Sequence, residues 1–194
     1  MFLVFKNKKS PFFWAFLLDV LTITFIPQIL IFLLFIVLSF FFKNININMY
    51  VSIIISCVIF PNIYTHNRKI KKEKLDNKKL LFLFLYLILF IVCYKDNLNL
   101  FYLNIIVGFS EEFLFRYILN SILKEYMVNY KVINMLNIIF FVFGFHNGRG
   151  FLENLIIRVP ISLVLQNLFM KYKNLYLNSF IHSFYNIILS MGVL

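Results

Sequence analysis

Two glutamates and one arginine lie close together inside an apolar segment, in the sequence SEEFLFRYIL. Glu111, Glu112 and Arg116 fall in the stretch from Leu98 to Leu119, which is long enough to cross a bilayer. Placing one charged side chain at mid-membrane costs roughly 2.5–3.5 kcal/mol on insertion scales. We therefore expect these three groups either to pair with each other or to take part in chemistry.

Helical spacing separates the three residues into a pair and a single carboxylate. Glu112 and Arg116 are four positions apart, so they share one helix face and can form an ion pair. Glu111 is rotated by about 100° from Glu112 and has no basic residue three or four positions later. A carboxylate in such a site suits a general base. The structural alternative is an ion pair that only stabilises helix packing, with Glu111 supporting it.

Two histidines lie in later apolar segments. His146 ends the run FFVFGFH, and His182 lies in SFIHSFYN, with Asn186 four positions later on the same helix face. A histidine and an asparagine side by side can donate two hydrogen bonds to a developing oxyanion. Together with Glu111, these residues supply the parts needed for hydrolysis by an activated water. The alternative is that they form only hydrogen bonds between helices.

The composition predicts an integral membrane protein. Hydrophobic residues make up 62% of the chain and charged residues 14%, against about 45–50% and 25% in soluble domains. We expect an all-α, polytopic transmembrane bundle in which residues 1–97 form N-terminal helices and a basic loop, and residues 98–194 form the catalytic core. Apolar runs predict about seven spans, at 18–42, 49–65, 80–94, 98–119, 132–147, 154–170 and 174–193.

The net charge of +11 is distributed unevenly between the two sides of this topology. The N-terminus, the loop 66–79 and the segments near Lys124 and Lys171 carry 14 of the 19 basic residues, and the opposite side carries only Lys43, Lys95 and Arg149. Cytoplasmic loops of membrane proteins are enriched in Lys and Arg, so we expect the N-terminus in the cytoplasm. The basic loop is expected to face anionic lipid, and no nucleic-acid partner is predicted.

These residues resemble the three motifs of the CAAX protease and bacteriocin-processing (CPBP) family, whose best-known members are the type II CAAX prenyl endopeptidases. Glu111-Glu112-x-x-x-Arg116 matches the first motif and His182-x-x-x-Asn186 matches the third. The second motif of the family is Phe-x-x-x-His, and here Val142 stands four positions before His146. The resemblance covers about residues 100–194.

The resemblance implies a role for each motif residue. Glu111 and His146 are expected to activate a water, His182 and Asn186 to stabilise the oxyanion, and Glu112 and Arg116 to hold the site together. It implies no cofactor and no metal. The predicted spans place His146 about 8 Å deeper than Glu111, unless the fifth helix begins later, near Asn134 or Asn137, or tilts.

The leading hypothesis is an intramembrane glutamate endopeptidase whose site opens toward the cytoplasmic half of a bacterial cell membrane. Its partners would be the lipid bilayer and a peptide or membrane-protein substrate, with the oligomeric state left open. One alternative is a zinc protease that uses Glu111, His146 and His182 as ligands. A second is a non-catalytic membrane protein that confers bacteriocin self-immunity or regulates a partner. A transporter is the weakest alternative.

Overall fold

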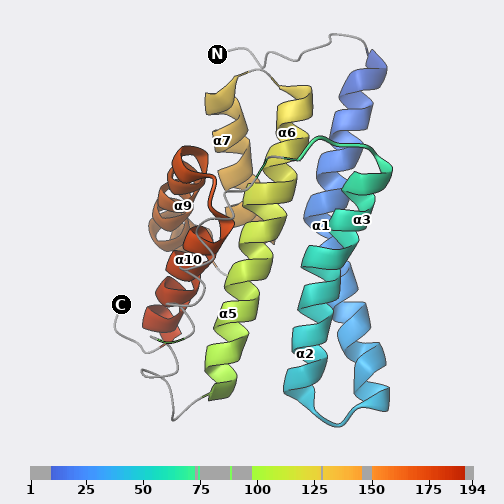
Figure 1. Ribbon diagram of the computed structural model, residues 1–194, viewed down its shortest axis with the longest axis vertical. Coiled ribbons are helices and arrows are strands. Elements are labelled where there is room, and N and C mark those ends of the chain that lie inside the picture. Colours follow the sequence, from blue (N-terminus) through green and yellow to red (C-terminus); the bar gives the residue numbers. More distant parts are fainter. Residues whose placement is uncertain are drawn as a thin grey trace.

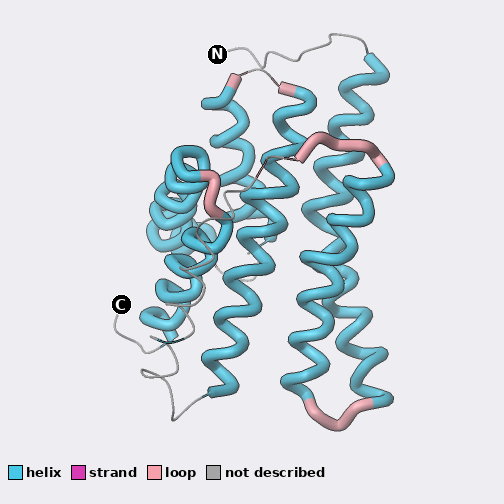
Figure 2. Tube along the Cα trace, in the orientation of Figure 1, coloured by secondary structure: helices cyan, strands magenta, loops and turns pink. Residues whose placement is uncertain are grey.

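The computed structural model describes residues 10–72, 74, 88, 98–127, 129–145 and 150–190. These residues form helices joined by short loops, and the helices lie side by side as a bundle (Figures 1 and 2). The all-helical fold class is therefore confirmed. The expected span at 80–94 lies outside the described residues, apart from Ile88.

The N-terminal part is a pair of long antiparallel helices. Helix α1 (Ser10–Phe41) contains Pro27 in its interior, and a short loop leads from it into a second continuous helix. That helix consists of α2 (Ile45–Ile54), the π-helical turn η1 (Ile55–Ile59) and α3 (Phe60–Asn67). The Asn44 side chain caps the start of α2 by accepting a hydrogen bond from the Ile47 amide. Many apolar side chains of α1 point outward, such as Trp14 and Phe32, each 64% exposed, which fits a helix surrounded by lipid.

A buried aspartate attaches this helix pair to the rest of the bundle. Asp19 on α1 accepts hydrogen bonds from the hydroxyl of Tyr64 on α3, at 2.5 Å, and from Tyr126. It also pairs with Nη2 of Arg68 at 2.7 Å. The carboxylate is therefore satisfied by three donors, which removes most of the penalty of burying it.

The helix that carries the two glutamates is longer than the sequence predicted. It runs without a break through α5 (Leu98–Glu112), the π-helical turn η3 (Phe113–Leu119) and α6 (Asn120–Tyr126), and ends where Met127 becomes extended. The expected end at Leu119 is therefore wrong, because the following sequence NSILKEY contains good helix formers and neither Gly nor Pro. As a result, Glu111 lies near the middle of the continuous helix.

Four further segments complete the described bundle. They are α7 (Tyr130–Ile139) with the π-helical turn η4 (Phe140–Phe145), α8 (Phe151–Glu153) with η5 (Asn154–Arg158), α9 (Val159–Tyr172) and α10 (Leu175–Ser190). Lys173 ends α9 in the left-handed conformation, at φ 48°, and the chain turns there into α10. Helix α10 packs along α5, and this contact holds the candidate site.

Three helices of the described part are long and apolar enough to cross a membrane: Phe13–Phe41, Ile45–Asn67 and Phe151–Tyr172. Together with the exposed apolar side chains, they support an integral membrane protein. The seven-span topology, the cytoplasmic N-terminus and the division of the chain at residues 97 and 98 stay predictions.

Candidate active site

Glu112 and Arg116 form the ion pair that their spacing predicted. Nε of Arg116 lies 3.5 Å from Oε2 of Glu112, and both side chains are fully buried. The pair lies where α5 passes into η3, and π-helical turns of this kind occur often at functional sites.

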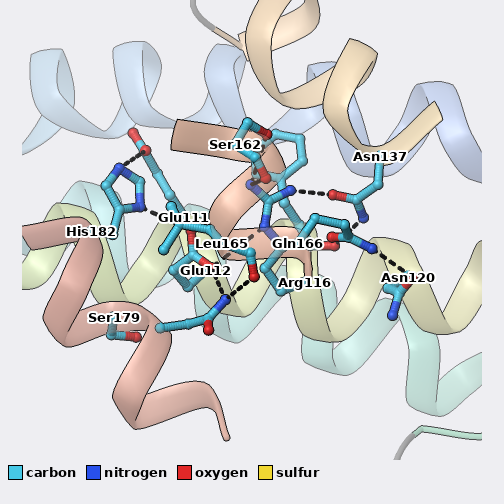
Figure 3. Close-up of polar contacts among 12 residues, drawn as sticks. Glu111, Glu112, Arg116, Asn120, Asn137, Ser162, Leu165, Gln166, Ser179 and His182 are labelled. Atoms are coloured by element: carbon cyan, nitrogen blue, oxygen red, sulfur yellow. Dashed lines mark hydrogen bonds and ion pairs between the residues drawn. The ribbon is translucent and has the colours of Figure 1, made fainter. Parts of the chain in front are cut away.

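Arg116 also connects α5 to two other helices. Its guanidinium donates to Oδ1 of Asn137 on α7, and its Nη2 donates to Oγ of Ser162 on α9 at 2.9 Å. The guanidinium carbon lies 4.8 Å from the ring centroid of Phe141, in a cation–π arrangement. Figure 3 shows Asn137 and Ser162 beside the guanidinium. A planar group with several donors suits this task, because it can bond in several directions at once.

His182 lies between the two carboxylates. Its Nδ1 is 2.9 Å from Oε1 of Glu112, and its Nε2 is 3.4 Å from Oε2 of Glu111 (Figure 3). Asn178, one turn earlier on α10, donates to Oε2 of Glu112 at 3.0 Å. Because Glu112 accepts from Asn178 and pairs with Arg116, it acts as an acceptor toward His182, and Nδ1–H of the histidine is the donor.

A glycine allows α5 and α10 to approach closely enough for these contacts. A Cβ atom built on Gly108 would lie 2.1 Å from Oγ of Ser183 and 3.1 Å from its backbone nitrogen. Gly108 is one turn before Glu111 and Glu112, and Ser183 directly follows His182. The absence of a side chain at Gly108 therefore sets the helix separation at which the carboxylates meet the histidine.

A cavity of about 440 Å³ borders this cluster. Glu111, His182 and Asn186 line it, and Phe141 forms part of the same wall. The structure therefore brings together three of the four residues predicted to be catalytic. The fourth, His146, lies outside the described residues.

Helix α7, which precedes His146 in the sequence, tests where the fifth predicted helix begins. It begins at Tyr130, so the later start near Asn134 or Asn137 is not observed. The glutamate helix extends to Tyr126, so Glu111 lies roughly 20 Å from the end of that helix. The expected depth of His146 concerns a residue outside the described ranges.

Phe141, the residue before Val142, makes an aromatic contact with His182. The Phe141 ring packs edge-on against His182, with centroids 5.7 Å apart. Residues 140–145 form a π-helical turn, in which hydrogen bonds join positions five apart rather than four.

Comparison with known families agrees with this geometry. Residues 94–188 match the family model described as type II CAAX prenyl endopeptidase Rce1-like. The match covers just under half of the chain, and over these residues the chain is similar to the Rce1-like family. The suspected relation to CAAX proteases is thereby confirmed. No curated protein matches the chain. No solved structure matches it.

The Rce1-like segment contains every residue of the cluster described above, and its family is one of membrane proteases. Sequence reasoning missed Asn178, Asn137 and Ser162, which hold the Glu112–Arg116 pair. Asn178 was detectable, because it lies four positions before His182 and so shares its helix face. Asn137 and Ser162 could not be detected from the sequence, because their role depends on how α7 and α9 pack against α5.

The zinc alternative depends on residues that the structure only partly describes. Within the described ranges, no group of three or more His, Cys, Asp or Glu side chains is arranged to hold a metal ion. The proposed zinc set includes His146, which lies outside those ranges.

Proposed function

We propose that this protein is an intramembrane endopeptidase that cleaves a peptide bond with a water activated by Glu111. The observation that carries the proposal is the placement of Glu111 and His182 side by side on the wall of one cavity, 3.4 Å apart, with Asn186 lining the same space. The neighbouring Glu112 is occupied by Arg116, Asn178 and His182. Glu111 thus lines the cavity, while Glu112 holds the site together.

The chemistry follows from this division of tasks. Glu111 takes a proton from a water as its oxygen attacks the scissile carbonyl carbon. The carbonyl oxygen becomes negatively charged and accepts hydrogen bonds from Nε2–H of His182 and from the Asn186 amide. Glu111 then gives the proton to the leaving nitrogen, the carbon–nitrogen bond breaks, and an acid and an amine result. The family resemblance assigns His146 to the same water.

His182 can donate from both nitrogens in this scheme only when both carry protons. Nδ1 faces Glu112 at 2.9 Å, and Nε2 lies 3.4 Å from Glu111 at the cavity. Glu112 therefore acts as a positioning residue that holds the histidine in the orientation needed for oxyanion binding. Arg116 in turn holds the Glu112 carboxylate in place through their ion pair.

Comparison of peptide profiles tests the proposal. Cells would express the wild type, Glu111→Gln or His182→Ala at equal levels in the membrane, and membrane and secreted peptides would be compared by mass spectrometry. We expect one or more products to disappear in both variants. General-base catalysis contributes about 10²–10⁴-fold to the rate, so residual product should fall below detection.

Two control variants remove a carboxylate or a histidine at exposed positions outside the site. Glu125→Gln changes an exposed carboxylate of α6, and His66→Ala changes an exposed histidine of α3. Both should leave the profile unchanged. Identical profiles for wild type and Glu111→Gln, in cells where deletion of the protein has a phenotype, would contradict the proposal and favour the immunity or regulatory alternative.

A further inference from the structure

A groove separate from the catalytic cavity runs between α7 and α9. Its volume is about 450 Å³, and neither Glu111 nor His182 lines it. Met135 and Ile139 on α7 and Leu163 on α9 form part of its wall, and all three are exposed at the surface of the bundle. We call this space the α7–α9 groove.

The α7–α9 groove has a polar end and an apolar length. Lys131 and Asn134 line it in the first turns of α7, and Asn167 lines it near the end of α9. These residues lie at the same end, because Gln166, next to Asn167, donates to Asn134 at 2.9 Å. Beyond them the lining is entirely apolar as far as Phe143 and Val159.

The polar end carries positive charge. Lys131 is exposed, and Lys171 lies one turn after Asn167 on the same face of α9 and is also exposed. Lys131 belongs to the first turn of α7, which contains no acidic residue, so its charge adds to the positive end of the helix dipole. Within the described ranges neither lysine has an ion-pair partner.

The carboxylates nearest in sequence are engaged elsewhere. Glu125 on α6 accepts a hydrogen bond from the Lys71 amide, and Asp19 on α1 pairs with Arg68. The polar end of the groove therefore favours an anion that is supplied from outside the chain.

A second surface groove shows that this combination is not general to the bundle. The groove between α9 and α10 is of similar volume, about 460 Å³, and no charged residue lines it. Its walls are aliphatic apart from Tyr185. Both grooves offer apolar surface to lipid chains, but only the α7–α9 groove joins that surface to lysines.

We propose that the α7–α9 groove binds an anionic phospholipid, with the phosphate at Lys131 and Lys171 and one acyl chain along the apolar length. Basic pockets between transmembrane helices commonly bind anionic headgroups. The apolar length provides no hydrogen-bonding side chain, which suits a hydrocarbon chain and does not suit a peptide backbone. The inference concerns a second site and does not rest on the proposed protease activity.

The bound lipid would contact the two helices that support the catalytic cluster. Asn137 on α7 and Ser162 on α9 both accept hydrogen bonds from Arg116. An acyl chain that packs against α7 and α9 together stabilises their arrangement, and any ligand that binds only the folded state raises its stability. Anionic lipid should therefore raise the unfolding temperature of the protein.

Native mass spectrometry of the purified full chain in detergent tests the headgroup site. The probes are palmitoyl-oleoyl phosphatidylglycerol and phosphatidylcholine, which have the same acyl chains and differ in headgroup charge. We expect the wild type to bind phosphatidylglycerol more tightly. Lys131→Gln and Lys171→Gln should each weaken that binding about fivefold and leave phosphatidylcholine binding unchanged. Lys43→Gln, in the loop between α1 and α2, is the matched control and should change neither.

A filled groove tests the acyl-chain site. Leu163→Trp places a large side chain in the α7–α9 groove, whereas Val164→Trp changes the next residue, which lines the other groove. The two positions are similarly exposed, at 45% and 49%, so both variants should fold. We expect Leu163→Trp alone to reduce tight binding of phosphatidylglycerol and to abolish the rise in unfolding temperature that this lipid gives the wild type.

Three results would overturn the inference. They are equal affinity of the wild type for the two lipids, equal effects of Lys131→Gln and Lys43→Gln, and equal effects of Leu163→Trp and Val164→Trp. Glu111→Gln should bind both lipids as the wild type does, because the groove lies outside the catalytic cavity. Lipid binding and peptide cleavage are thus measured separately, and the failure of one proposal leaves the other standing.

Discussion

Nδ1 of His182 lies 2.9 Å from Oε1 of Glu112, and this contact joins α10 to the centre of the α5–α6 helix. Glu112 is itself held by Arg116 and by Asn178. The orientation of the histidine therefore depends on a chain of buried polar contacts that begins at α7 and α9 and ends at the cavity. Buried polar networks of this kind make the packing more rigid, and losing one member affects the others.

Removing Glu112 should damage both stability and activity. Glu112→Ala leaves the Arg116 charge buried without its partner, which typically costs about 3–5 kcal/mol. We expect a corresponding fall in the free energy of unfolding, measured by denaturant titration in detergent micelles, and loss of peptide cleavage.

A double variant separates these two effects. Glu112→Ala with Arg116→Leu removes both charges, and it should recover a large part of the stability lost by Glu112→Ala alone. Activity should stay low, because His182 still lacks its acceptor. Recovery of both properties would show that Glu112 has no positioning role.

A larger residue at position 108 should disturb the site, because Gly108 lies at the contact between α5 and α10. Gly108→Ala places a methyl group 2.1 Å from Oγ of Ser183, so α5 and α10 must separate or Ser183 must move. We expect lower activity and a loss of about 1–3 kcal/mol in the free energy of unfolding.

A second substitution at the contact provides the control. Ser183→Ala alone should be nearly neutral, and Gly108→Ala/Ser183→Ala should be more active than Gly108→Ala, giving a favourable coupling energy in a double-mutant cycle. Strict additivity of the two substitutions would argue against the contact.

The sequence was sufficient to predict the parts of the site that depend on helical spacing. Glu112 with Arg116 and His182 with Asn186 are each four positions apart, so their shared faces follow from the geometry of any helix. What the sequence could not supply is which helices meet. The pairing of His182 with both glutamates requires α10 to lie against α5, and the close approach at Gly108 is visible only once that packing is known.

One expected helix boundary was wrong, because the glutamate helix continues past Leu119 to Tyr126. The helices of the site also contain π-helical turns, at Phe113–Leu119 and Phe140–Phe145. A π-helical turn shifts the helix face by a fraction of a turn, and regular 3.6-residue periodicity cannot anticipate this shift.

The buried Asp19 should contribute measurably to stability. Tyr126→Phe removes a hydroxyl that donates to this carboxylate and leaves part of its hydrogen-bonding capacity unsatisfied. The expected cost is about 1–3 kcal/mol in the free energy of unfolding. Tyr130→Phe is the matched control, because Tyr130 is 61% exposed and should tolerate the change. Equal effects of the two substitutions would contradict a specific role for the Asp19 cluster.

Lys124 predicts a dependence of stability on pH. Burial at the end of the bundle lowers the pKa of Lys124 to about 8, and repulsion from Lys173 adds to the effect. In the unfolded chain the group has a pKa of about 10.4. Between these values the unfolded state binds more protons than the folded state, so stability should rise as pH increases from about 8 to about 10.

Substitution of Lys124 isolates this contribution from other titrations. At pH 7 Lys124 is charged in both states, and its burial opposes folding, so Lys124→Gln should unfold at a higher temperature than the wild type. That advantage should shrink as pH rises and nearly vanish by pH 10, because the folded wild type then no longer carries the charge. Lys131→Gln, at an exposed position of α7, should show no such trend. Thermal unfolding in detergent at several pH values measures the difference, and an advantage that stays constant from pH 7 to pH 10 would show that Lys124 does not titrate in this range.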